Sequence, residues 1–156
     1  MKILLSYGTN SGGTYFAAET VRKQSEERGH TVDLKEAREL DSASIHNYDL
    51  TLFGSNTWFY NNKEGQPHLW YLNLEESFKA RDYIGRNFAI FALGDSSYAQ
   101  FAESSDYLEN MIRERNGVIA CPSLKIDRYY KDEKKNQNFI KKWTLDLLKE
   151  CNKFST

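Results

Sequence analysis

The chain has 156 residues, 40% of them hydrophobic and 28% charged, with a formal net charge of −1. This length fits a single domain over residues 1–156 that can bury a sizeable core. No apolar run is long enough to span a bilayer and no signal-peptide core is visible, so we expect a cytoplasmic protein with no membrane partner. The two cysteines, Cys121 and Cys151, form no C-x-x-C motif, which argues against a disulfide framework and against a zinc site.

Charge is spread unevenly along the chain. Residues 125–153 carry nine Lys or Arg and five Asp or Glu, so the C-terminal segment is the basic end. Nucleic-acid binding is one interpretation of this bias. Because acidic residues interrupt the basic ones, as on a solvated helix face, we expect no nucleic-acid partner.

Apolar runs and helical patterns alternate in chain order. Short buried strands are expected at residues 2–7, 31–34, 49–53 and 87–93, and a fifth strand starts at Val118. Helical spacing indicates helices at residues 16–24, closed by Gly29, at 101–115 and at 138–148, and the end of another helix at 75–81. This order predicts an α/β fold with one doubly wound, five-stranded parallel sheet and helices on both faces. The polar residues 61–68 are expected to have no strong structure of their own.

The first strand-to-helix turn, S-Y-G-T-N-S-G-G-T at residues 6–14, has the composition of an anion site. The start of a helix offers unpaired N–H groups and a positive dipole end, and Gly12 and Gly13 allow the backbone to approach a phosphate closely. Neutral hydroxyl and amide donors come from Thr9, Asn10, Ser11 and Thr14. The turn has no lysine and fits neither the Walker loop nor the dinucleotide fingerprint, which disfavours nucleoside triphosphates and NAD. Taken alone, it is equally consistent with an ordinary helix cap.

Two further loops, at residues 54–66 and 94–101, follow strand ends at the same edge of the predicted sheet. Each places an aromatic residue, Trp58 or Tyr98, shortly after a glycine turn. Either residue alone is more typical of core or surface. Together with a phosphate loop, they indicate two aromatic faces that sandwich a planar heterocycle, with backbone N–H groups of residues 94–98 at its polar edge.

These three loops resemble those of the flavodoxin family. Residues 9–14 are similar to its T-x-T/S-G-x-T phosphate loop, Thr57-Trp58 is similar to its second-loop tryptophan, and G-D-S-S-Y at residues 94–98 closely resembles the short-chain type. The resemblance covers nearly the whole chain. It implies non-covalently bound FMN as the cofactor, held by Thr9, Asn10, Ser11, Gly12, Gly13, Thr14, Asn56, Thr57, Trp58, Phe59, Leu93, Gly94, Asp95, Tyr98, Phe101 and Ala102.

The same resemblance implies a soluble, low-potential one-electron carrier. Its partners would be an NADPH- or ferredoxin-linked reductase, or a photosystem, and acceptor enzymes, with the carrier itself a monomer. No catalytic constellation or metal site is visible, since His30, His46 and His68 lie apart in the sequence. The alternative is a flavodoxin-like NAD(P)H:quinone reductase, which needs room over the flavin that two aromatic walls would occupy. A signalling receiver domain is disfavoured because Ser6 and Tyr7 stand where an acidic pair would be needed.

The chain departs from the family pattern in three respects. Its near-neutral charge weakens the expectation of a very low potential and of steering toward basic partners. Phe59 stands where many relatives have glycine, and Lys63 introduces a positive charge near the expected flavin. A local acidic strip remains, which fits either partner docking or a solvated helix face: Asp95, Glu103, Asp106 and Glu109.

Overall fold

The computed structural model describes residues 1–60 and 62–153, apart from the side chain of Phe59. Within them, six parallel strands form one sheet: β1 (Lys2–Gly8), β2 (Thr31–Glu36), β3 (Leu50–Asn56), β6 (Asn87–Gly94), β7 (Val118–Ile119) and β8 (Leu124–Asp127). The strand order is β2-β1-β3-β6-β7, and β8 also pairs with β6.

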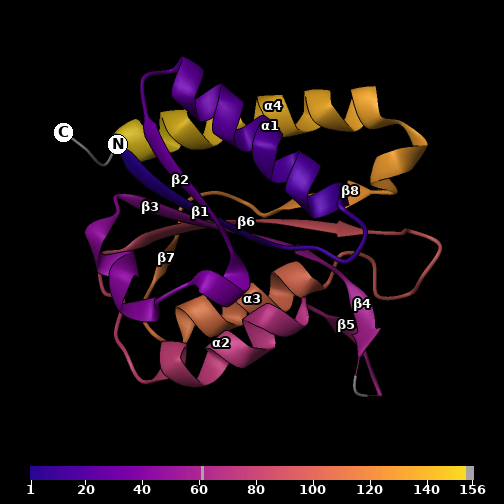
Figure 1. The fold of residues 1–156 in the computed structure, drawn as a ribbon, viewed down its shortest axis with the longest axis horizontal. Helices are drawn as coiled ribbons and strands as arrows, with labels where there is room; N and C mark the ends of the chain where they lie inside the picture. Colours follow the sequence, from indigo (N-terminus) through magenta and orange to yellow (C-terminus); the bar gives the residue numbers. More distant parts are fainter. Residues whose placement is uncertain (61, 154–156) are drawn as a thin grey trace.

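Helices cover both faces of this sheet. They are α1 (Gly13–Glu27), α2 (Leu69–Lys79), α3 (Ser104–Arg113) and α4 (Glu133–Lys153), with short 3-10 turns η1 (Ala37–Glu39), η2 (Ser42–Asn47) and η3 (Tyr129–Lys131). Figure 1 shows α1 and α4 on one face of the sheet and α2 and α3 on the other. This is the three-layer, doubly wound arrangement that the sequence predicts.

Successive residues of each strand point to opposite faces and so bury two apolar layers. Ile3 and Leu5 of β1 belong to the layer under α1 and α4, whereas Leu4 belongs to the layer under α2 and α3. The second layer holds a cluster of packed aromatic rings: Phe53, Tyr71, Phe78, Tyr83 and Phe88. Much of the aromatic content therefore stabilises the core rather than surrounding a ligand.

The predicted fold class is confirmed, with two differences in the sheet. β3 continues through Gly54 to Asn56, where the sequence suggested a turn, because Asn56 pairs with Leu93 of β6. The fifth position of the sheet is shared by β7 and β8, which pair with the beginning and the end of β6. Pro122 lies between these two segments and has no backbone N–H for the ladder.

The helix ends also differ from the prediction. α3 starts at Ser104 rather than at residue 101, because Ala102 has a left-handed backbone with a φ of 50°. α4 begins at Glu133, five residues before the predicted start, since its first turn is polar and has no apolar spacing. α2 ends at Lys79, close to the predicted residue 81.

The prediction of no structure for residues 61–68 is wrong where the chain is described. β4 (Trp58–Tyr60) and β5 (Lys63–Gln66) form an antiparallel hairpin in which Tyr60 pairs with Lys63. Asn62 has a φ of 61°, which asparagine tolerates and tight hairpin turns require. Asn61 lies outside the described residues.

Candidate functional site

The three predicted loops begin at one level of the sheet. Gly8 of β1 pairs with Ser55 of β3, and Asn56 pairs with Leu93 of β6. The loops that follow these strands therefore emerge at the same carboxyl edge, beside the β4–β5 hairpin in Figure 1. Ligands of doubly wound sheets bind at this edge.

The first loop leaves the start of α1 suited to an anion. Gly12 is the N-cap, with a φ of 90°, and its N–H donates to Thr9 Oγ1 at 2.9 Å. No side chain caps the helix, and its first turn contains no acidic residue. The Tyr130 hydroxyl donates to the Ser11 carbonyl oxygen at 2.5 Å and so closes one side of the loop. The first-turn N–H groups and the positive end of the dipole are arranged as an anion site requires.

Gly13 brings this loop against β6. A Cβ at Gly13 would lie 3.0 Å from Leu93 Cδ2, so the start of α1 packs closely on β6 with little room for a side chain there. Thr14, next in α1, is buried, whereas Asn10 is exposed on the surface of the loop. The structure thus brings the predicted residues 9–14 and Leu93 together.

Among the described residues of the second loop, Asn56 has a buried polar atom without a partner. Asn56 Oδ1 is buried and has no hydrogen-bond partner among the described residues. Thr57 Oγ1 lies 2.7 Å from Ser104 Oγ and joins the loop to α3. Because a buried oxygen without a donor is unfavourable, Asn56 is a candidate for a bond to a bound ligand.

Trp58 is held in place by polar and aromatic contacts. Its Nε1–H donates to the Pro67 carbonyl oxygen at 3.0 Å. Its indole lies nearly parallel to the rings of Tyr60 and His68, with centroids 5.2 and 6.1 Å away. These contacts fix the orientation of the indole before any ligand is bound.

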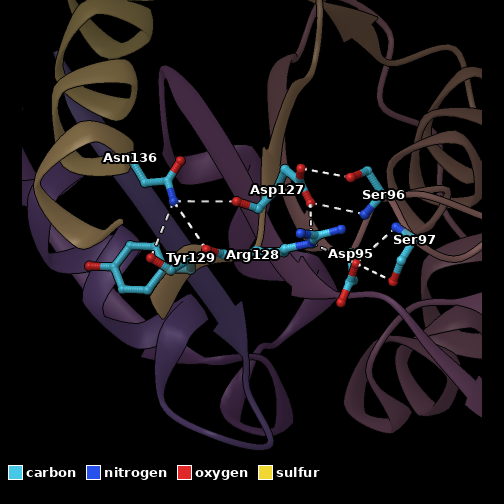
Figure 2. Close-up of polar contacts among 7 residues, drawn as sticks. All are labelled: Asp95, Ser96, Ser97, Asp127, Arg128, Tyr129 and Asn136. Carbon is cyan, nitrogen blue, oxygen red and sulfur yellow. Dashed lines mark hydrogen bonds and ion pairs between the residues drawn. The ribbon is translucent and has the colours of Figure 1, made fainter. Parts of the chain in front are cut away.

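The third loop is stabilised by two carboxylates, which Figure 2 shows together. Asp95 Oδ1 accepts from the N–H and hydroxyl of Ser97 at 2.9 and 2.6 Å and from Arg128 Nε at 2.9 Å. Asp127 accepts from the N–H and hydroxyl of Ser96 at 2.9 and 2.7 Å. The bonds from Ser97, followed by the Arg128 guanidinium, lower the pKa of Asp95 to about 2.

Asn136 of α4 supports the turn that presents Arg128, a role with no recognisable signal in the sequence. Its Nδ2 lies 3.2 to 3.3 Å from the carbonyl oxygens of Asp127, Arg128 and Tyr129, as Figure 2 shows. Arg128 has a φ of 46°, and its N–H donates to the Gly94 carbonyl oxygen at 2.8 Å. The start of α4 therefore anchors the third loop through the end of β8.

The predicted acidic strip is partly neutralised in the fold. Besides the Asp95–Arg128 pair, Glu109 Oε2 lies 2.9 Å from Arg113, and Asp106 lies 3.9 Å from Lys125. These cations come from other parts of the sequence or from the next helical turn. The strip therefore carries less net negative charge than its uninterrupted sequence suggests.

A cavity of about 370 Å³ lies between the second and third loops. It is lined by Thr57, Trp58, Glu64, Gly65, Gly94, Asp95, Tyr98 and Gln100. Five of these residues are predicted site residues, whereas the phosphate-loop residues do not line this cavity. The other three, Glu64, Gly65 and Gln100, were not predicted from the sequence. Of these, Gly65 could have been noticed as an isolated glycine in a loop, and it has a φ of 71°.

The remaining predicted residues have different surroundings. Tyr98 lines the cavity and is 70% exposed. A Cβ at Gly94 would lie 2.7 Å from the backbone nitrogen of Ala102 and 3.3 Å from Phe101, so the end of the third loop packs directly on its first residue. The backbone of Phe59 belongs to β4, and its side chain lies outside the described part of the structure.

Together, the fold and the site define a doubly wound α/β protein with a helix start suited to an anion and a cavity bordered by Trp58 and Tyr98 at the same sheet edge. The model of the family described as Flavodoxin matches residues 5–141, and the chain belongs to this family. Among the described residues, no helix has the length and apolar character needed to cross a membrane.

Individual relatives agree with this assignment. The chain is 35% identical over 137 residues to a protein named probable flavodoxin 2 of Bacillus subtilis, covering 87% of this chain and 88% of the relative. The fold matches the crystal structure of oxidised flavodoxin 2 from Bacillus cereus, with a TM-score of 0.87, 24% identity and coverage of 96% and 99%. It also matches Fusobacterium nucleatum flavodoxin bound to flavin mononucleotide, with a TM-score of 0.82, 14% identity and coverage of 96% and 98%.

Proposed function

We propose that this chain binds FMN non-covalently at the carboxyl edge of its sheet and carries electrons one at a time between proteins. The observation that supports this most directly is the set of three loops that meet there, each with a different chemistry. Membership of the flavodoxin family, whose members are electron-transfer proteins rather than enzymes with substrate sites, points the same way. One structural neighbour is itself described as bound to flavin mononucleotide.

The residues present fit the three parts of FMN. The start of α1, with Gly12 as an uncapped N-cap, suits the phosphate. The orphaned Asn56 Oδ1 suits a hydroxyl donor of the ribityl chain. The cavity bordered by Trp58 and Tyr98 suits the flat ring system.

The surroundings of the site favour a low reduction potential. When bound, FMN supplies the electron-transfer chemistry, and the protein orients it and limits its contact with water. Residues 9–14 carry no cation to offset added negative charge, and Glu64 and Asp95 line the cavity. Both features disfavour reduction, although Arg128 partly compensates Asp95.

We assign the partners and setting on the basis of the family. The donor is an NADPH- or ferredoxin-linked reductase, the acceptors are redox enzymes, and the carrier works as a cytoplasmic monomer. A quinone reductase is not favoured, because Trp58 and Tyr98 both border the cavity that would receive the flavin.

A reconstitution assay tests this function. The FMN-loaded chain is mixed with NADPH and cytochrome c, with and without an NADPH-linked flavodoxin reductase. We expect cytochrome c reduction that requires the reductase and rises with the concentration of this chain. Steady NADPH oxidation by the chain alone with menadione as acceptor would contradict the carrier function and support a quinone reductase.

A further inference from the structure

His68 connects the first and second loops of the site. It is the N-cap of α2 and only 5% exposed. Its backbone N–H donates to Ser55 Oγ at 2.8 Å. A Cβ at Gly8 would lie 2.6 Å from His68 Cβ, so the histidine packs directly on the backbone where the first loop begins.

The neutral form of His68 fits its hydrogen-bond partner. Nδ1 accepts from the Trp70 N–H at 3.1 Å, which caps α2. With Nδ1 as the acceptor, the proton of the neutral ring sits on Nε2. A second proton on Nδ1 would face the Trp70 N–H, set donor against donor and place a positive charge at a helix N-terminus.

The same ring also supports Trp58. The indole lies 6.1 Å from the imidazole centroid at an interplanar angle of 9°, and it bonds to the carbonyl of Pro67, the residue before His68. Through one side chain, the phosphate loop and the aromatic wall of the cavity share a support.

We propose that uncharged His68 is a positioning residue that fixes the phosphate loop relative to Trp58, so that protonation of His68 weakens cofactor binding. The inference rests on the proposed FMN function. It predicts that FMN binds the neutral form of His68 more tightly than the charged form.

Few charges surround this ring. The segments packed against it are the ends of β1 and β3, β4 and the start of α2, and their contacting residues are uncharged. Arg38 lies 5.2 Å from the centre of the Trp70 ring, and Glu64 of β5 lines the cavity with Trp58. Burial lowers the pKa of His68 below its ordinary value of 6.5, and this effect outweighs the opposing influence of the Thr9 backbone, which raises the pKa. The neutral form therefore prevails at neutral pH.

The test is a fluorescence titration of the apoprotein with FMN between about pH 8 and pH 5, which brackets the titration of an ordinary histidine. His68→Asn keeps a good helix cap but removes the ring and the titration. At the upper pH we expect FMN to bind this variant about tenfold more weakly than wild type, because the first loop and Trp58 lose the packing of the imidazole. As pH falls through the pKa of His68, the wild-type advantage should shrink toward unity.

The controls separate this effect from others. The phosphate of FMN titrates near pH 6, but equally for both proteins, so the affinity ratio removes its contribution. The control variant is His46→Asn, in the η2 turn before β3. The His46 ring stacks on Tyr83, with ring centroids 5.2 Å apart. This variant should bind FMN as wild type does at every pH.

Three results would overturn the inference. A wild-type to His68→Asn ratio that stays constant with pH would make His68 merely structural. A ratio that rises as pH falls would make it a cationic phosphate ligand. A wild-type protein that binds no FMN at any pH would overturn the proposed function, and this inference with it.

A second measurement needs no variant. If FMN binds the protein with neutral His68 tenfold more tightly than the protein with charged His68, FMN binding must in turn lower the pKa of His68 by about one unit. NMR titration of the imidazole of the wild type, with and without FMN, measures this directly. A pKa that is unchanged or raised by FMN would contradict the proposal even if His68→Asn does not fold.

Discussion

At the scale of single residues, the proposed phosphate site offers neutral donors where many phosphate sites use cations. The first loop combines a glycine N-cap with Thr9, whose hydroxyl is already engaged by the Gly12 N–H. That bond keeps the loop in shape before a ligand arrives, which reduces the ordering required on binding. Thr14, buried in the first turn of α1, is the better candidate for direct contact with the phosphate.

Thr14→Val tests this assignment because valine keeps the shape and removes the hydroxyl. We expect FMN binding to weaken by about 1–3 kcal/mol, as when a hydrogen bond to a charged group is lost. Riboflavin, which lacks the phosphate, should bind the variant no worse than it binds wild type. The matched control is Thr20→Val in the same helix, where the hydroxyl bonds only to the Phe16 carbonyl oxygen and FMN affinity should not change. An equal loss for both flavins would make Thr14 structural.

The pH dependence of the third loop also follows from single residues. Asp95 has a pKa of about 2, below its ordinary 3.8, so its stabilising contribution is complete above pH 3.8 and is lost as pH falls toward 2. Asp127, whose pKa is also lowered, acts in the same direction. We expect the urea midpoint of Asp95→Asn to lie slightly below that of wild type at neutral pH. The gap should close as pH falls below about 4. A gap that widens in acid would contradict the assigned bonds.

At the scale of elements, the loops depend on helices that are distant in sequence. Asn136 in the first turn of α4 supports the Arg128 turn, and that turn holds the loop after β6. The anchoring explains how residues with no regular structure of their own are kept in place beside the cavity.

Asn136→Ala should therefore destabilise more than its position on a polar helix turn suggests. Removing Nδ2 takes a donor from three carbonyl oxygens, of which that of Tyr129 lies in a buried contact and that of Arg128 keeps the Lys131 N–H. We expect a loss of about 1–3 kcal/mol in the free energy of unfolding. The comparison is Asn138→Ala, an exposed residue of the same helix, with an effect within about 0.5 kcal/mol of wild type. Urea denaturation measures the stability of both variants. Equal effects would show that the hydrogen bonds of Asn136 do not stabilise the protein.

The elements also show what the sequence can and cannot predict. Continuous apolar runs such as Asn87–Gly94 were predictable because burial on both faces leaves a direct signature. The extension of β3 to Asn56 and the β4–β5 hairpin were not, because both depend on pairing with another strand. The same holds for the site: glycines and aromatics after strand ends were visible, whereas His68 and Asn136 act through contacts that only the fold creates.

At the scale of the whole molecule, the sheet register brings the phosphate loop, the orphaned Asn56 and the aromatic cavity to one edge. Neither a formal net charge of −1 nor the partly neutralised acidic strip provides a strong overall field. Partner recognition should therefore depend on the local surface around the cavity more than on long-range steering.

The most direct test of this account is a titration of the apoprotein with FMN and, separately, with riboflavin, followed by flavin fluorescence. We predict one FMN bound per chain, with strong quenching by the aromatic residues of the cavity and much weaker binding of riboflavin. A protein that takes up no FMN, or that binds riboflavin as tightly as FMN, would contradict a flavin site anchored by the phosphate at the start of α1.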